Sequence, residues 1–219
     1  MAAARDRWVC LDVGETIIDE TRVWETWADI LGVTRFTFIA TIGAMLARGR
    51  PFHEAFEFLG FTDRERYRAK FNAAYAGFQE RDLYSDALLA IDALRAAGYR
   101  LAIVANQPAE RTAELRFIGV RAEVMAMSEE MGAHKPAPEF YDEVLRLLGG
   151  PAPADVAYVG DRLDNDIHPA AAAGMRPVWL RRGPWAAITT DQPPPGTLVV
   201  DSLSELVERI GEAWPDAAS

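Results

Sequence analysis

The sequence is poor in cysteine and histidine, and it carries fewer positive than negative charges. Its single cysteine, Cys10, excludes an internal disulfide and argues against a zinc site. One reduced thiol suits the cytoplasm, where we expect the protein to reside. The 33 Asp and Glu residues outnumber the 23 Lys and Arg residues and give a formal net charge of -10. This balance argues against nucleic acid as a partner.

Long apolar runs are also lacking. No stretch approaches the ~18 consecutive apolar residues of a membrane-spanning helix. The N-terminal segment 1–7 is too polar for a signal peptide. We therefore expect no membrane partner. An anionic small substrate stays compatible with the net charge, because a local cation can dominate a pocket.

The composition is that of a globular protein, with 50% hydrophobic and 26% charged residues. A length of 219 residues fits one large α/β domain, or one core with a modest inserted domain. The sequence shows no internal repeat and no low-complexity tract.

An apolar run near the N-terminus, from Trp8 to Leu11, ends abruptly at Asp12. The run predicts a β-strand, and Gly14 and Glu15 follow it closely. In α/β proteins, ligands bind at the carboxyl ends of the strands. Asp12 is therefore a candidate nucleophile or metal ligand, and the alternative is that it caps an ordinary turn.

Residues 21–78 show helical periodicity and no clear strand pattern. From Tyr84 onward, predicted strands and helices alternate. Strands are predicted at residues 99–105, 122–127, 154–159, 177–180 and 197–200, and helices at residues 86–97, 108–117, 136–148, 167–173 and 203–213. Such alternation predicts a parallel sheet with helices on both faces.

The simplest arrangement is an α/β protein with a Rossmann-like core that is interrupted early. The core would comprise residues 1–16 and 82–219, and residues 17–81 would be an inserted all-α unit. An insertion at that point lies over the carboxyl ends of the strands and can act as a lid. We expect Trp24, Trp27 and the phenylalanines of this unit to form its core, with a place in a substrate pocket as the alternative.

Polar residues follow three further predicted strands. They are Asn106 and Gln107, then Lys135, then Asp161 and Asp166. Each has an ordinary solvated alternative, but together they would meet Asp12 at one edge of the sheet. Carboxylates gathered in one place repel one another unless a cation lies among them. Oxygen ligands without a His or Cys cluster favour Mg²⁺ over zinc, and Lys135 could hold an anion such as phosphate.

This order of motifs resembles the haloacid dehalogenase (HAD) superfamily over essentially the whole chain, with a helical cap like that of its subfamily I. The most specific matches are Gly160-Asp161 with Asp166, and His134-Lys135-Pro136 followed by Glu139-Phe140-Tyr141. The resemblance implies a parallel Rossmann-like core and a hydrolytic activity.

The resemblance also implies roles for individual residues. Asp12 would be the nucleophile that forms an aspartyl intermediate, and Lys135 would steady it and the transferring group. Asn106 and Gln107 would donate hydrogen bonds to the phosphoryl oxygens, and Glu15 is a further candidate for substrate binding. The implied Mg²⁺ ligands are Asp12, the backbone carbonyl of Gly14, Asp161, and Asp166 either as a ligand or as a support.

Two positions depart from the family pattern. Phosphatases of the family carry a second aspartate, which acts as general acid and base, where this chain has Gly14. Such groups are worth ~10²–10⁴ in rate. Ala105 replaces the small hydroxyl residue that normally ends the second core strand. The proton-transfer role is therefore vacant at its usual position.

Four nearby residues are candidates for this role. Glu15 is adjacent, but neighbouring side chains of an extended backbone point to opposite faces. We therefore favour a structural role for Glu15 in the turn that leads into the insertion. The other candidates are His134, Asp19 and Glu20.

Three functions compete. We favour a Mg²⁺-dependent phosphatase that acts on a small phosphorylated metabolite through an aspartyl-phosphate, as a monomer or homodimer. A 2-haloacid dehalogenase is the first alternative, because halide leaves without a proton and Gly14 is then no handicap. That chemistry needs no metal, however. The second alternative is a catalytically weak or silent member that binds a phospho-ligand or a protein partner through its cap.

Overall fold

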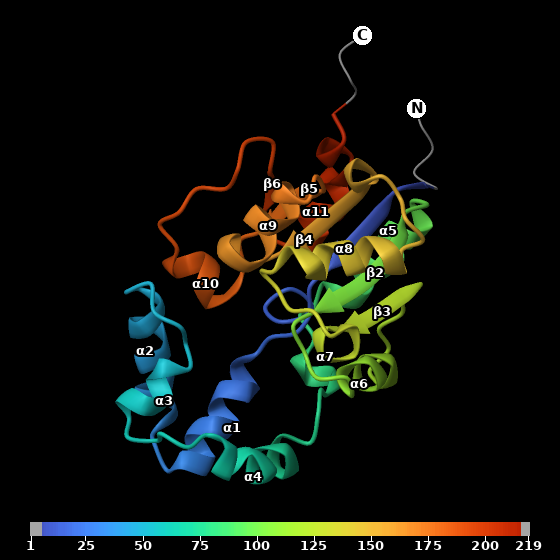
Figure 1. Cartoon of the computed structure of the whole chain (residues 1–219). Coiled ribbons are helices and arrows are strands. Elements are labelled where there is room, and N and C mark those ends of the chain that lie inside the picture. Colours follow the sequence, from blue (N-terminus) through green and yellow to red (C-terminus); the bar gives the residue numbers. More distant parts are fainter. Residues whose placement is uncertain (1–5, 216–219) are drawn as a thin grey trace.

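A parallel six-stranded sheet forms the centre of the protein, whose computed structural model describes residues 6–215. The strand order is β3-β2-β1-β4-β5-β6 (Figure 1). The strands are β1 (Trp8–Leu11), β2 (Arg100–Ala105), β3 (Val124–Met127), β4 (Val156–Gly160), β5 (Arg176–Leu180) and β6 (Leu198–Val200). All four residues of β1 are buried, because helices cover both faces of a parallel sheet.

Two helical layers cover the sheet (Figure 1). On one face, Val9 and Leu11 join the core formed by α5 (Ala87–Ala96) and α11 (Leu203–Arg209). On the other face, Trp8 and Cys10 pack with α8 (Pro138–Leu147) and α9 (His168–Ala172). The remaining core helices are α6 (Arg111–Phe117), α7 (Ser128–Met131) and α10 (Gly183–Ile188). The predicted Rossmann-like α/β class is confirmed.

Four helices lie between β1 and α5 in the chain and to one side of the sheet (Figure 1). They are α1 (Thr21–Leu31), α2 (Arg35–Leu46), α3 (Glu54–Phe58) and α4 (Glu65–Tyr75). Their aromatic residues pack together, and the rings of Trp27 and Phe71 stack with centroids 4.4 Å apart. Trp27 is buried as predicted, whereas Trp24 is half-buried and faces a cavity.

The predicted strands and helices of the core agree with the structure, apart from element ends and three short segments. The predicted helix 167–173 is preceded by a π-helical turn, Leu163–Ile167, and the predicted helix 203–213 ends as a 3-10 helix, Ile210–Ala213. Helices α7 and α10 were not predicted from the sequence. Both are too short to show a helical period.

Among residues 6–215, no single helix is long and apolar enough to cross a membrane. Only the bent pair α1 and α2 reaches that length and composition when its two helices are taken together.

Candidate active site

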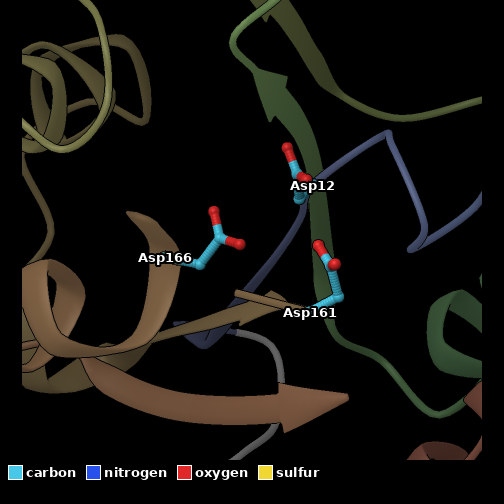
Figure 2. Close-up of side chains that lie close together, drawn as sticks. All are labelled: Asp12, Asp161 and Asp166. Carbon is cyan, nitrogen blue, oxygen red and sulfur yellow. The ribbon is translucent and has the colours of Figure 1, made fainter. Parts of the chain in front are cut away.

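The site lies at the carboxyl ends of β1 and β4, the two central strands. Asp12 follows β1, and its backbone N–H donates to the carbonyl of Val159 on β4 at 2.9 Å. Asp161 follows β4, and Asp166 lies in the π-helical turn after it. Carboxylate oxygens of these three buried aspartates lie within 4.8 Å of one another (Figure 2). Residues far apart in sequence thus form one acidic cluster.

Lys135 supplies the positive charge of this cluster. Its Nζ donates to Oδ1 of Asp12 and to Oδ1 of Asp166, each at 2.6 Å, and only 5% of the residue is exposed. Burial lowers the pKa of Lys135, but attraction to Asp12 and Asp166 outweighs it, and the pKa is raised. Burial raises the pKa of Asp12 to about 6, although Lys135 opposes this shift. The ammonium group is therefore firmly charged between two carboxylates.

Asn106 fixes the backbone of Lys135. Its Nδ2 donates to the carbonyl of Lys135 at 2.9 Å, and its Oδ1 accepts from the N–H of Lys135 at 2.8 Å. Both ends of the amide are thus engaged by one residue. Asn106 thus positions Lys135, and its expected contact with phosphoryl oxygens stays a prediction.

The acidic cluster fits a hard cation. Asp161 is 3% exposed, its Oδ2 has no hydrogen-bond partner among residues 6–215, and burial raises its pKa well above the usual range. An unsatisfied buried carboxylate is costly unless a cation neutralises it. Both oxygens of Asp166 are already bound, Oδ1 by Lys135 and Oδ2 by the N–H of Arg162 at 3.0 Å. Asp12 and Asp161 therefore suit direct metal binding, and Asp166 suits support.

Glu15 belongs to the turn after β1. Its φ of 50° lies in the left-handed region, which favours glycine. Its Oε2 accepts from the hydroxyl of Tyr84 at 2.5 Å, and its Oε1 accepts from the N–H of Glu20 at 3.1 Å. Burial raises its pKa. These bonds tie the turn to the start of α1 and to the core.

Glu20 stands immediately before α1, beside Gly14. Its Oε1 accepts from Nε2 of Gln107 at 3.5 Å. Burial raises the pKa of Glu20 to about 8, and repulsion from Glu15 and Asp12 adds to the shift. A carboxyl group that holds a proton near neutral pH thus faces the aspartate cluster.

One cavity of about 330 Å³ opens onto these groups. Seven predicted site residues line it, namely Asp12, Gly14, Glu15, Asn106, Gln107, Lys135 and Asp161. Asp166 lies behind Lys135 and does not line the cavity. The structure thus brings the predicted residues together.

Aromatic residues form the outer wall of the cavity. Trp24 lies 5.4 Å from Phe52 and 6.3 Å from Trp185, between ring centroids. The guanidinium of Arg162 lies 5.5 Å from the ring of Trp185. Neither Arg162 nor Trp185 was among the predicted site residues. Pro184, in the first turn of α10, is a helix-start signal that could have identified this segment.

The fold and the site define a hydrolase with an aspartate at the end of its central strand. The model of the haloacid dehalogenase-like hydrolase family matches residues 7–174, and the chain belongs to this family.

Curated relatives match parts of the chain. A glyceraldehyde 3-phosphate phosphatase of Methanopyrus kandleri is 37% identical over 103 residues, which are 46% of this chain and 44% of that protein. A phosphoserine phosphatase of Thermus thermophilus is 31% identical over 140 residues, 62% of this chain and 55% of that protein. The chain therefore spans about half the length of the curated relatives it matches.

Solved structures share the whole fold. The putative HAD-hydrolase YfnB from Bacillus subtilis, bound to magnesium, has a TM-score of 0.68 at 22% identity, over 93% of this chain and 98% of that one. An L-2-haloacid dehalogenase from Xanthobacter autotrophicus has a TM-score of 0.66 at 19% identity, over 93% and 98%. At such identities the likeness establishes the fold alone.

Proposed function

We propose that the protein is a Mg²⁺-dependent phosphatase that acts on a small phosphorylated metabolite. The observation that carries the proposal is the bridge from Lys135 to Asp12 and Asp166 beside the unsatisfied carboxylate of Asp161. The names of the curated relatives, which are phosphatases of glyceraldehyde 3-phosphate and of phosphoserine, support this substrate class.

Asp12 is the nucleophile of the proposed reaction. Its carboxylate attacks phosphorus, the bond from phosphorus to the leaving oxygen breaks, and an aspartyl-phosphate forms. Lys135 holds Asp12 in place through the 2.6 Å bond and neutralises charge on the transferring group. Water then breaks the aspartyl-phosphate bond and releases phosphate.

The proposed metal ligands are Asp12, the Gly14 carbonyl and Asp161, with Asp166 as support through Lys135. Bound Mg²⁺ would supply positive charge for the phosphoryl oxygens. The solved structure of YfnB is bound to magnesium, which agrees with this proposal.

We also propose the division into domains. Residues 1–16 and 82–219 form the core, and residues 17–81, with helices α1 to α4, form a cap. Trp24 and Phe52 belong to the cap, and they meet the core residue Trp185 at the outer wall of the cavity. The part of the substrate beyond the phosphate would lie against these rings, so the cap selects the substrate.

The test is phosphate release from p-nitrophenyl phosphate and from a panel of metabolite phosphates. We expect turnover with Mg²⁺, and loss of turnover with EDTA or in Asp12→Asn. Asp164→Asn is the matched control, because Asp164 is an exposed carboxylate of the same loop that is paired with Arg162. No phosphate release from any ester would refute the proposal.

A 2-haloacid dehalogenase is the second candidate, and Gly14 favours it because halide leaves without a proton. The buried, unsatisfied Asp161 counts against it, because that reaction needs no cation. Chloride release from 2-chloropropionate in the presence of EDTA would reverse the ranking.

A further inference from the structure

The space beside Gly14 is filled by a carboxyl group from another residue. A Cβ added at Gly14 would lie 2.6 Å from Oε1 and 2.9 Å from Cδ of Glu20. These separations are shorter than real contacts. The carboxyl group of Glu20 therefore occupies the space that the side chain of an aspartate at position 14 would need.

The turn after β1 brings Glu20 to this place. Gly14 and Ile18 form an isolated bridge, and the N–H of Glu15 donates to the carbonyl of Ile18 at 2.7 Å. The chain thus folds back on itself before α1 begins. Glu15 holds the backbone of Glu20, and Gln107 donates to its carboxylate. Glu20 is held from two sides, and it lines the same cavity as Asp12 and Lys135.

Three other carboxyl or imidazole groups near the turn are not placed for this role. Glu15 is bound to Tyr84. Asp19 accepts from the N–H of Thr21 at 2.8 Å and borders a different cavity. His134 is exposed and does not line the cavity.

We propose that Glu20 is the general acid and base of this site and takes the role that is vacant at Gly14. The proposal rests on the phosphatase function proposed above. In the first step, protonated Glu20 gives its proton to the leaving oxygen as the bond from that oxygen to phosphorus breaks. In the second step, the Glu20 carboxylate takes a proton from the water that attacks the aspartyl-phosphate. Glu20 is then protonated again, and the alcohol and phosphate are the products.

The test compares Glu20→Gln with wild type on p-nitrophenyl phosphate and on an alkyl phosphate that wild type hydrolyses. Glutamine keeps the size of the side chain and removes the proton. Nitrophenolate leaves without a proton. The rate at which Glu20→Gln completes its first turnover of p-nitrophenyl phosphate therefore stays within about tenfold of the wild-type rate. Later turnovers are slow, because water attack has lost its base, and a burst of nitrophenol appears. With the alkyl phosphate, the rate of the first turnover by Glu20→Gln falls by a factor of ~10²–10⁴.

The matched control is Asp19→Asn, which removes the neighbouring carboxylate and keeps an acceptor for Thr21. We expect wild-type rates from it. Equal loss on both esters in the first turnover of Glu20→Gln, or no loss on either, would overturn the role of Glu20. A wild type that hydrolyses no ester refutes the phosphatase proposal, and with it this one. The two failures are therefore distinguishable.

Moving the carboxyl group from position 20 to position 14 tests whether the two positions can serve the same role. Gly14→Asp alone should fold, because the group that its side chain meets is the movable carboxyl end of Glu20. Glu20→Ala should fold but hydrolyse the alkyl phosphate slowly. The double variant that combines Gly14→Asp with Glu20→Ala should hydrolyse the alkyl phosphate at least tenfold faster than Glu20→Ala. A double variant that folds and stays as slow as Glu20→Ala would contradict the equivalence of the two positions.

Discussion

The Nζ atom of Lys135 lies 2.6 Å from Oδ1 of Asp12, although 123 residues separate them in the chain. The side chain of Lys135 is 1% exposed and that of Asp12 is 10% exposed. Asp166 shares the same ammonium group at 2.6 Å. One buried cation thus holds two carboxylates that would otherwise repel each other.

Loss of this cation should disable the site. In Lys135→Met, Asp12 and Asp166 face each other unpaired, and we expect kcat for phosphate release to fall by ~10²–10³. Leaving buried charges unpaired should also lower the free energy of unfolding by about 3–5 kcal/mol. Urea denaturation and steady-state kinetics measure the two effects. Lys70→Met replaces the other lysine of the chain, which is exposed, and should change neither.

Asp161 should make stability depend on pH and on the metal. Burial raises its pKa in the folded state, so its neutral form stabilises the protein below its unfolded pKa of about 3.9. This contribution is lost as pH rises through the folded pKa. In EDTA, the thermal midpoint of wild type should therefore fall between pH 4 and pH 8, and that of Asp161→Asn should fall less. Burial also raises the pKa of Asp12, to about 6. This shift lowers the thermal midpoint with rising pH in wild type and in Asp161→Asn alike.

Added Mg²⁺ should reverse the loss in wild type. We expect it to raise the midpoint at pH 8 for wild type and much less for Asp161→Asn. Asp164→Asn, with the exposed carboxylate of the same loop, should respond like wild type. An Asp161→Asn protein that Mg²⁺ stabilises as strongly as wild type would contradict the proposed site.

Trp185 should bind the part of the substrate beyond the phosphate. Its Nε1 is buried and finds no hydrogen-bond partner in the described part of the chain, and its ring borders the cavity. Trp185→Ala should raise KM by about tenfold, because an aromatic contact is worth about 0.5–1.5 kcal/mol beyond its buried area. Trp185→Phe keeps a ring and should raise KM less. The kcat value serves as the internal control, and a loss confined to kcat would contradict a binding role.

The sequence predicted the central residues because each stands beside a recognisable element. Asp12 and Asp161 end apolar strands, and Lys135 precedes a proline that comes shortly before a helix. Parallel strands have their carboxyl ends at one edge of the sheet. The hydrophobic periodicity and the alternation of strands and helices were therefore enough to predict that these residues lie close together. The parallel sheet and the family follow from the same pattern, whereas the strand order was not predicted.

The positions of Glu20 and Trp185 could not be predicted in this way. Glu20 reaches Gly14 only because the turn forms the bridge from Gly14 to Ile18. No periodicity encodes such a reversal. Trp185 lies on α10, a helix of six residues, and its contact with Trp24 depends on how distant segments pack. The turn places Glu20 through one specific bridge, and the contact between Trp185 and Trp24 is tertiary, so the hydrophobic pattern locates neither side chain.

Arg22 should hold the beginning of the helical insertion to its end. Its Nε donates to Oδ1 of Asp82 at 2.7 Å, and its two terminal nitrogens donate to the carbonyls of Tyr75 and Gly77, each at 2.6 Å. The side chain of Asp82 is 3% exposed, so Arg22→Met leaves a buried carboxylate unpaired. We expect the free energy of unfolding to fall by about 3–5 kcal/mol in urea denaturation. Arg35→Met breaks an ion pair with Asp29 in which both side chains are more than half exposed, and the loss of stability should be much smaller. Equal losses in the two variants would show that the buried pair contributes no more than a surface pair.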